Sequence, residues 1–460
     1  MKRVILLFFG LIFFLGCHEA VNTSNPTDSN QNEWINDTQG PPQERKWTFI
    51  VYMAADNDLE SAAIANFNEL EAVRYGNAPI SILVLLDRSP YYDRTNGDWS
   101  DTRLFEIKSD PGGLTGTMVS SRLDCPELGL TRDTETELNT SDPLVLSRLI
   151  DFAKRAYPAE NYALFIWGHG TGWRSRPTQN EQTRAIAFDD THEQFMSLPA
   201  FGRAVSGKGL SVIGFDTCYA AVLEVVYEIK NDARLFIGSQ GAILSSGWDY
   251  YTLFSDFIKK PNLTISDLGN SVQYQFMRRY GSLNNASISQ IELSRVETLF
   301  IKFENFTGLL SETITDFNSR NMILGEILQN VESHYFTSFP SDMFIDISDF
   351  SKKMIKLLPD FQEDMELQNK IIMAADELND ALAYAVPSSW ARNGTEMKIG
   401  VHFIPMHGVA VPAAMHELAY VRGSIAMDKS SFVENSRHWV PNAIPQERSF
   451  LDKVFYTVYN

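Results

Sequence analysis

Short apolar runs that alternate with helical patterns are the feature that most restricts the fold of this 460-residue chain. Most of these runs are almost uninterrupted, which is typical of parallel strands that are covered on both faces. The strands predicted in this way are 48–54, 80–87, 103–108, 162–168, 210–215 and 235–239. Because helical patterns separate these runs, we expect an α/β fold with a central, mostly parallel sheet and right-handed crossovers.

The predicted helices of the first half are 58–75, 142–156 and 219–230. From about 262 to 385 the pattern becomes mostly helical, and strand-like segments return at 384–386 and 398–405. Segment 173–195 is polar and shows no periodicity, so we predict an exposed loop there. The two acids that precede the first helix, Asp56 and Asp58, are predicted to cap it.

The N-terminus has the pattern of an export signal. Positive charge at Lys2 and Arg3 precedes an apolar run, 4–16, which is too short to cross a bilayer of about 30 Å. The run ends in 14-FLGC-17, which resembles a bacterial lipobox, so we predict lipidation of Cys17; plain secretion or a retained anchor are the alternatives. The polar segment that follows, up to residue 46, is expected to be a disordered tether.

Charge and cysteine content exclude several classes of protein. The formal net charge is -19 and no basic run is present, so we expect no nucleic-acid partner. The three cysteines are Cys17, Cys125 and Cys218. If Cys17 carries lipid, the only possible internal disulfide joins the other two, and a disulfide framework is excluded.

Reactive side chains follow two of the predicted strands. His169 lies between two glycines after 162–168, and Cys218 follows 210–215. In an open α/β sheet the binding crevice lies beyond the carboxyl ends of the strands, so both side chains can meet there. A helix that starts directly after Cys218 would lower the pKa of its thiol. A thiolate and a histidine suit a cysteine peptidase, although a buried structural cysteine and a histidine held in a turn remain alternatives.

Several motifs in the same order resemble the clostripain family of caspase-like cysteine peptidases. The matching segments are 47-WTFIVYMAADNDLE-60, the WGHG and GW pieces around His169, GFD-x-C-Y around Cys218, 234-RLFIGSQ-240, 247-GWDYY-251 and 344-FIDISDF-350. The resemblance covers roughly residues 47–405. It implies a caspase-like α/β sandwich, with a central mostly parallel β-sheet flanked by helices, and a largely helical C-terminal half.

The resemblance also implies roles for individual residues. Cys218 would be the nucleophile and His169 the general acid of an endopeptidase that cleaves after Arg or Lys. The backbone N–H groups of Gly170 and Cys218 would form the oxyanion hole. Asp216 would line the S1 pocket, where its carboxylate could pair with a basic P1 residue; the alternative is that it only caps the following helix.

One departure from the family pattern affects specificity. After 237-IGSQ-240 the family continues with acidic residues and a Pro-Gly turn, whereas this chain reads 241-GAILSSGWDY-250. A second acidic contribution to the S1 pocket is therefore missing or comes from Asp249. A peptidase with a non-basic P1 preference remains an alternative.

Activation and metal binding are further implications of the resemblance. Family members are often cleaved in a loop after the catalytic histidine, and Arg184 is the favoured self-cleavage site, with a merely solvated arginine as the alternative. No cofactor is required and no metal ligands are assigned. Calcium remains possible through Asp189, Asp190 and Glu193.

The sequence therefore predicts five regions: a lipoprotein signal peptide 1–17, a tether 18–46, a caspase-like catalytic domain 47–260, a helix-rich region 261–405 that returns strands to the core, and a C-terminal extension 406–460. The predicted protein is a monomeric cysteine endopeptidase of the bacterial cell envelope, lipid-anchored or secreted. It would act on peptides or proteins and reach the membrane only through its lipid. A non-catalytic caspase-like surface-binding lipoprotein is the alternative.

Overall fold

The computed structural model of the chain describes residues 45–177, 182–284, 286–335, 343–392 and 398–403. The predicted signal peptide with Cys17, nearly all of the tether and the C-terminal extension lie outside the described residues. Within the described part, no helix is both long and apolar enough to cross a membrane.

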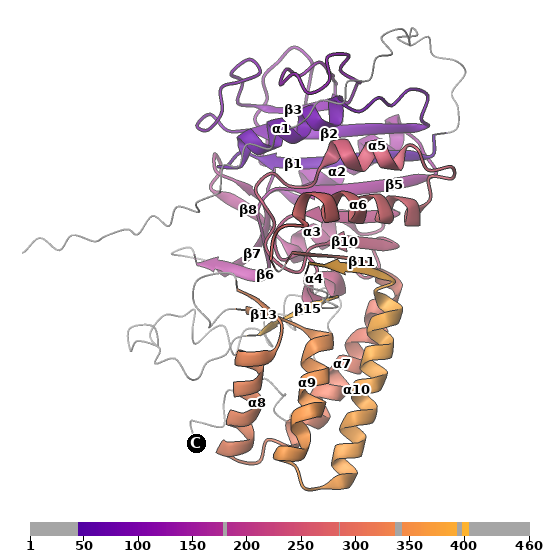
Figure 1. Cartoon of the computed structure of the whole chain (residues 1–460). Helices are drawn as coiled ribbons and strands as arrows, with labels where there is room; N and C mark the ends of the chain where they lie inside the picture. Colours follow the sequence, from indigo (N-terminus) through magenta and orange to yellow (C-terminus); the bar gives the residue numbers. More distant parts are fainter. Residues whose placement is uncertain (1–44, 178–181, 285, 336–342, 393–397, 404–460) are drawn as a thin grey trace, which may run out of the picture. The chain divides into compact units, whose positions relative to one another are not determined.

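A nine-stranded sheet organises the described residues (Figure 1). Its central strands are parallel and follow the order β10-β9-β5-β1-β2. Their bounds are β1 (Trp47–Ala55), β2 (Ile80–Arg88), β5 (Asn161–Trp167), β9 (Val212–Asp216) and β10 (Leu235–Gly238). These five strands coincide with predicted apolar runs.

Antiparallel strands complete both edges of this sheet. On one edge β3 (Thr102–Glu106) pairs with β2, and β4 (Ser121–Arg122) pairs with β3. On the other edge β11 (Ser287–Glu292) pairs with β10, and β14 (Ser388–Ala391) pairs with β11. Only β3 and β11 run against the other strands of this sheet, so the prediction of a mostly parallel central sheet is confirmed.

Two apolar layers cover the sheet, because successive side chains of a strand point to opposite faces. In β1, where every residue is buried, Phe49 and Val51 belong to one layer and Ile50 and Tyr52 to the other. The first layer packs against α1 (Glu60–Glu71), α5 (Tyr250–Phe257) and α6 (Ile265–Tyr280). The second packs against α2 (Pro143–Ala156), α3 (Leu198–Val205) and α4 (Leu223–Glu228).

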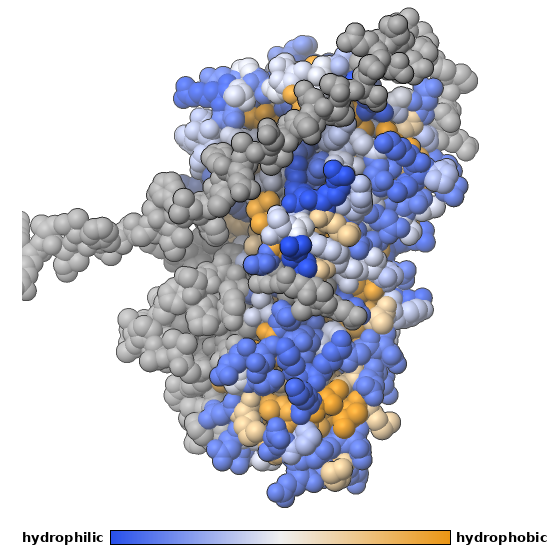
Figure 2. Space-filling model, in the orientation of Figure 1, coloured by the Kyte–Doolittle hydropathy of each residue, from blue (hydrophilic) through white to orange (hydrophobic). Residues whose placement is uncertain are grey.

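Longer helices dominate the segment after β11 (Figure 1). They are α7 (Val296–Glu312), α8 (Phe317–Asn330), α9 (Ile347–Leu357) and α10 (Met365–Ala385). A small sheet joins them to the core and contains β12 (Ser333–Tyr335), β13 (Met343–Asp346) and β15 (Gly400–Phe403); short 3-10 turns are η1 (Pro126–Leu128), η2 (Leu293–Arg295) and η3 (Leu358–Asp360). The predicted strand 384–386 is wrong, because Tyr384 and Ala385 form the last turn of α10. On the face in Figure 2, apolar side chains gather over this helical part.

The predicted loop 173–195 is also wrong. Most of its described residues, 173–177 and 182–195, belong to an antiparallel sheet of β6 (Gly170–Pro177), β7 (Gln182–Asp189) and β8 (Gln194–Ser197). Irregular pairing occurs in both strand pairs, between Gly170 and Ser175 and between Ile186 and Phe188. Such bulges interrupt the regular alternation of side chains, and this is why the sequence shows no strand periodicity here.

Candidate active site

His169 and Cys218 follow neighbouring strands of the central sheet. Strands β5 and β9 are parallel, and their register places Trp167 opposite Asp216. Beyond this pair the backbone N–H of Gly168 lies 3.5 Å from the carbonyl oxygen of Asp216. Each reactive residue therefore comes two positions after a paired residue, at the carboxyl edge where the crevice of an α/β sheet lies.

The two loops touch at Gly170. A β-carbon at this position would lie 2.6 Å from Thr217 Oγ1 and 2.8 Å from the carbonyl oxygen of Cys218. No side chain fits at such distances, so glycine is required for the loop of His169 to lie against the backbone of Cys218. The neighbouring Gly168, with φ of 142°, also approaches other backbone closely, since a β-carbon there would lie 3.1 Å from the carbonyl oxygen of Ala54.

Asp58 holds the imidazole of His169. The distance between His169 Nε2 and Asp58 Oδ1 is 2.6 Å, and the edge of the ring faces Phe188 of β7, with centroids 5.7 Å apart. Both partners are accessible, with side-chain exposures of 39% for His169 and 68% for Asp58. A carboxylate bound at one ring nitrogen fixes the orientation of the ring and leaves Nδ1 for another group.

The predicted capping role of Asp56 and Asp58 is wrong. Helix α1 begins at Glu60, and its N-cap residue, Leu59, makes no side-chain cap hydrogen bond. Asp56 instead accepts a hydrogen bond of 2.7 Å from the backbone N–H of Thr191. Asp58 was missed as a partner of His169, although its position just after β1 places it at the same edge of the sheet.

Cys218 does not lie at a helix N-terminus, contrary to the prediction. Helix α4 begins only at Leu223, and Tyr219 has a left-handed φ of 55°. The backbone N–H of Tyr219 donates to the carbonyl of Gly241, and those of Ala220 and Ala221 donate to the carbonyl of Ser239, at 2.8–3.0 Å. Because the segment directly after β10 satisfies these groups, the chain after Cys218 stays in a turn.

The thiol of Cys218 lies against the segment that follows β10. The backbone N–H of Ile243 lies 3.4 Å from Sγ, and the carbonyl oxygen of Ile243 lies 3.8 Å from it. Burial raises the pKa of Cys218, and the charge of Asp216 adds to this effect. The predicted lowering of this pKa is therefore wrong. Cys125 is free as well, so the two cysteines form no disulfide, and burial raises its pKa to about 11.

Asp216 is buried beneath the same segment. Both of its carboxylate oxygens accept the backbone N–H of Trp248, at 3.0 and 2.9 Å, so the residue does not cap a helix. A β-carbon at Gly247, which has φ of 60°, would lie 2.6 Å from Asp216 Oδ2. Burial raises the pKa of Asp216 to about 7, although the N–H of Trp248 opposes the rise.

An ion pair supports this segment from below. The guanidinium of Arg279, on α6, pairs with the carboxylate of Glu69, on α1. It also donates to the carbonyls of Ser246, Gly247 and Trp248, at 2.9, 3.2 and 2.9 Å. Arg279 therefore fixes the turn that covers Asp216, and its charge lowers the pKa of that carboxyl.

The other predicted site residues lie elsewhere. Asp249 is the N-cap of α5, and its carboxylate accepts from Thr252 N and Thr252 Oγ1, at 2.8 and 2.7 Å. Its carboxylate is thus already engaged by a helix. Arg184 lies in β7, opposite Ser175 of β6.

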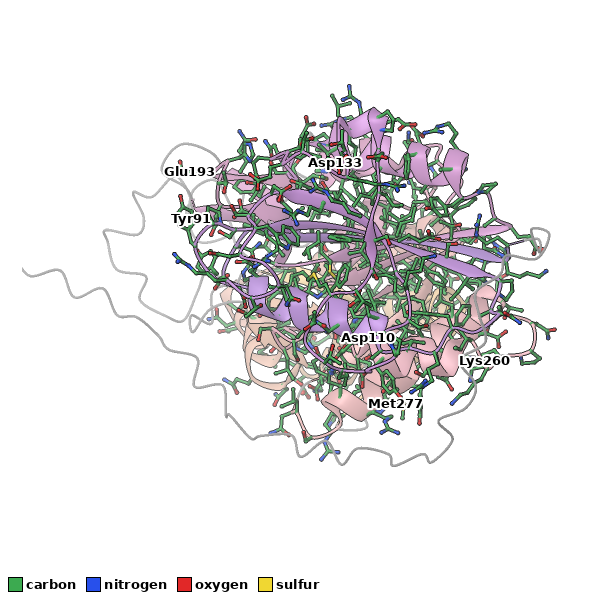
Figure 3. All side chains as sticks on the ribbon, turned by 90° about the horizontal axis from the view of Figure 1, so that it is seen from above. Tyr91, Asp110, Asp133, Glu193, Lys260 and Met277 are labelled. Atoms are coloured by element: carbon green, nitrogen blue, oxygen red, sulfur yellow. The ribbon has the colours of Figure 1, made fainter. Side chains whose placement is uncertain are left out.

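The three acids predicted for calcium do not form one group. Asp190 accepts a hydrogen bond of 2.9 Å from the hydroxyl of Tyr92, and Glu193 is exposed at the outer edge of the molecule (Figure 3). Asp189 instead lies beside Asp56 and Asp87, and carboxylate oxygens of these three residues lie within 4.8 Å of one another. All three are buried, so the structure brings together a different set of oxygen donors from the predicted one.

A sheet with helices on both faces, and histidine and cysteine loops in contact at its carboxyl edge, defines a caspase-like α/β protein. A model of the clostripain family matches residues 51–434. The chain therefore belongs to the clostripain family.

Individual relatives agree with this assignment. Clostripain of Hathewaya histolytica is 26% identical over 257 residues, and the match covers 51% of this chain and 46% of that protein. The match thus spans about half the length of this curated relative. Among solved structures, a secreted C11 cysteine protease from Bacteroides thetaiotaomicron, in complex with an irreversible peptide inhibitor, gives a TM-score of 0.54 at 18% identity and covers 81% of this chain and 96% of its own. An inactive zymogen C11 protease from Parabacteroides distasonis gives 0.56 at 18% identity, covering 86% and 99%. These likenesses support the caspase-like fold.

Proposed function

We propose that this protein is a cysteine endopeptidase whose catalytic dyad is His169 and Cys218. The observation that carries the proposal is the contact of the two loops at Gly170, which leaves no room for a side chain between them. Membership of the clostripain family supports the same activity.

In the proposed reaction the sulfur of Cys218 attacks the carbonyl carbon of the scissile peptide bond. The thiol proton passes to His169, and the imidazolium then donates it to the departing amine as the C–N bond breaks. The product is a thioester acyl-enzyme. Water, deprotonated by His169, attacks the thioester and releases the acid and the thiol. Because burial raises the pKa of the Cys218 thiol, His169 is needed as its base as well as in the second half of the cycle.

Two groups would assist these steps. Asp58 would hold Nε2 of His169, so that Nδ1 faces the reacting atoms and the imidazolium is stabilised. The N–H groups of Gly170 and Cys218 would donate to the oxyanion of the tetrahedral intermediate. Loss of one such donor typically costs about 100–1,000-fold in rate, so the close packing at Gly170 matters for catalysis.

We further propose that Asp216 forms the base of an S1 pocket for Arg or Lys. Its position two residues before Cys218 supports the assignment, and its carboxylate becomes ionised near neutral pH. A non-basic P1 preference is the second candidate. It is favoured by the burial of Asp216 under Trp248 and by the engagement of Asp249 at α5.

The remaining features of the proposal concern location and maturation. The apolar run 4–16 and the sequence before Cys17 support export and lipid anchoring, and one relative of similar fold is described as secreted. We also propose a monomer that matures by self-cleavage after Arg184. Since Arg184 lies in a paired strand, β7 would have to separate from β6 before that bond could enter an active site.

Replacement of the nucleophile tests the proposed activity. Cys218→Ala should reduce cleavage of short Arg- and Lys-ended fluorogenic peptides to background, whereas Cys125→Ala should retain it, because the side chain of Cys125 is fully buried. An acyloxymethyl ketone with arginine at P1 should label Cys218 in the parent and in Cys125→Ala, with peptide mapping as the readout. Cleavage that persists in Cys218→Ala would show that the nucleophile is misassigned. No cleavage of any peptide by the parent would favour the non-catalytic alternative.

A further inference from the structure

Two exposed tyrosines project from the loop that follows β2. Tyr91 and Tyr92 come directly after the first residues of this loop and are 73% and 48% exposed. Their rings lie edge to face, with centroids 6.5 Å apart. Tyrosine is enriched at binding interfaces, so an exposed pair of tyrosine rings is a candidate binding surface.

A buried ion pair fixes the backbone of this loop. The guanidinium of Arg88, at the end of β2, lies 2.6 Å from the carboxylate of Glu60, and both side chains are fully buried. Glu60 also accepts from the backbone N–H of Asp93 at 2.8 Å, and Arg88 donates to the carbonyls of Asp93 and Thr95, at 2.8 and 3.0 Å. Because these bonds hold the chain directly after the tyrosines, a ligand would meet a loop that is already ordered.

The tyrosine pair lies beside the residues that hold His169. The hydroxyl of Tyr92 donates to the carboxylate of Asp190 at 2.9 Å, and Asp190 comes two residues after Phe188, whose ring faces the imidazole. The hydrogen bond with Asp190 raises the pKa of Tyr92 to about 12, and the charge of Asp58 contributes to the rise. The candidate binding surface is therefore continuous with the candidate active site.

The order of the strands shows which part of a substrate would reach this surface. Cys218 follows β9, His169 follows β5, and the tyrosines follow β2, in a sheet with the order β9-β5-β1-β2. In the proposed reaction His169 protonates the departing amine, so the leaving part of the substrate extends from β5 towards β2. The two strand spacings between them amount to about 10 Å, which an extended peptide crosses in about three residues.

The charge of the surroundings favours a basic ligand. Asp58, Asp190 and Glu193 are exposed, and they outnumber Arg94, the exposed basic residue of the loop itself. Figure 3 shows Tyr91 and Glu193 at the same outer edge of the molecule. Guanidinium and ammonium groups bind to the faces of aromatic rings, and nearby carboxylates add to the attraction.

We propose that Tyr91 and Tyr92 form a subsite for an arginine or lysine at the third residue after the scissile bond, P3′. The basic side chain would lie against the tyrosine rings, with the carboxylates of Asp190 and Glu193 beside it. This proposal rests on the proposed function and adds to it a substrate class, namely polypeptides with a basic residue in the leaving part as well.

Binding tests the subsite without any cleavage. Cys218→Ala protein is titrated with two fluorescein-labelled alanine-based peptides that carry arginine at P1 and either arginine or glutamine at P3′. The P3′ arginine peptide should bind about tenfold more tightly in fluorescence anisotropy, which corresponds to two exposed cation–π contacts. Tyr91→Ala/Tyr92→Ala in this background should remove the preference. Tyr92→Phe, which loses only the bond to Asp190, and Tyr384→Ala, at an exposed tyrosine of α10, should retain it.

Kinetics in protein that keeps its nucleophile separates this proposal from the activity proposal. Internally quenched forms of the two peptides should show the same tenfold ratio of kcat/KM in the parent and a ratio near one in Tyr91→Ala/Tyr92→Ala. A short P1-arginine aminocoumarin substrate has no P3′ residue, so its kcat/KM should be unchanged in this variant.

Three outcomes would overturn the subsite: equal binding of the two peptides, a preference that survives in Tyr91→Ala/Tyr92→Ala, or an equal loss of activity on the short substrate, which would mean that the loop only supports His169. If the parent cleaves none of these substrates, the proposed function fails, and the binding measurement still decides whether the tyrosines recognise a basic side chain.

Discussion

Two groups of carboxylates, buried except for the partly exposed Glu69, lie near the carboxyl ends of the central strands, and they are neutralised differently. Asp216 and Glu69, beneath the segment that covers Cys218, lie beside the guanidinium of Arg279. Asp56, Asp87 and Asp189 have no arginine or lysine as an ion-pair partner among the described side chains. The difference indicates two tasks for similar chemical groups.

A carboxylate that is paired with an arginine of the same chain has a structural role, because its charge is balanced in the absence of any ligand. Arg279 therefore fixes the turn over Asp216, whereas no arginine or lysine among the described side chains forms an ion pair with Asp56, Asp87 or Asp189. Buried ion pairs are rarely a large net gain over apolar packing, yet removal of one partner leaves an uncompensated charge. Substitution of single residues therefore tests whether the two groups of carboxylates are neutralised differently.

Removal of Arg279 should have the largest effect. Arg279→Met leaves the partly buried Glu69 without its cation and frees three carbonyls of the turn, so the free energy of unfolding should fall by about 3 kcal/mol. We take the lower end of the usual range because the side chains of Arg279 and Glu69 keep 19% and 16% exposure. Urea denaturation at pH 7 measures the loss.

The neighbouring Arg278 supplies the matched control for that experiment. Arg278 is exposed and contacts only the ring and hydroxyl of Tyr274 among the described interactions. Arg278→Met should change stability by no more than about 0.5 kcal/mol. Equal effects of the two substitutions would mean that the Glu69–Arg279 pair does not stabilise the turn over Asp216.

Substitution of Asp58, the exposed acid that binds His169, should have an intermediate effect, and only on activity. Asp58→Asn should lower kcat/KM by about 10–100-fold, chiefly through kcat, because an amide holds the ring of His169 but stabilises the imidazolium less. Its melting temperature should stay within about 1 °C of the parent, since Asp58 is 68% exposed. Asp58→Glu should recover part of the rate, and Asp133→Asn, at another exposed acid, should leave it unchanged. An unaltered kcat in Asp58→Asn would remove Asp58 from the catalytic group.

Strand positions could be predicted from the sequence because parallel central strands are apolar without interruption. That pattern placed His169 and Cys218 at the ends of β5 and β9, and the structure has both strands there. Their catalytic roles remain proposals. The start of α4 could not be predicted, because the N–H groups that a helix would use are bound by carbonyls of Ser239 and Gly241, which follow the next strand, β10.

Partners that are distant in sequence leave no local pattern. Glu69 and Arg279 are 210 residues apart. Each is an ordinary charged residue of its own helix, α1 or α6, so neither local sequence indicates the ion pair. Asp56 and Asp58 precede a helix, which is the usual place of a capping residue, so the sequence predicts caps. Their contacts in the structure, with Thr191 and His169, come from distant parts of the sequence. The sequence predicts Asp190 and Glu193 as the neighbours of Asp189. Its neighbours in the structure are Asp56 and Asp87, which only the topology of the sheet brings close to it.

The smallest predicted effect concerns Asp216 and the pH dependence of substrate choice. Its pKa of about 7 lies above the value of about 3.9 in an unfolded chain. The unfolded chain therefore releases this proton first, and Asp216 makes the fold less stable as pH rises from about 4 to about 7, with no further loss above. Only the ionised carboxylate pairs with a P1 arginine, so the ratio of kcat/KM for P1 arginine over P1 glutamine should rise through about pH 7.

Asp216→Asn should remove both pH dependences, because the amide keeps the bond from Trp248 but does not ionise. At pH 8 the arginine-to-glutamine ratio should fall about tenfold, and the melting temperature should rise above that of the parent. Use of the ratio cancels the titration of Cys218, which affects both substrates alike. Asp249→Asn, which removes the cap of α5, should lower stability by about 1 kcal/mol without changing the ratio. A ratio that follows Asp249 instead of Asp216 would move the basic pocket to the start of α5, and a ratio independent of both would establish the non-basic preference.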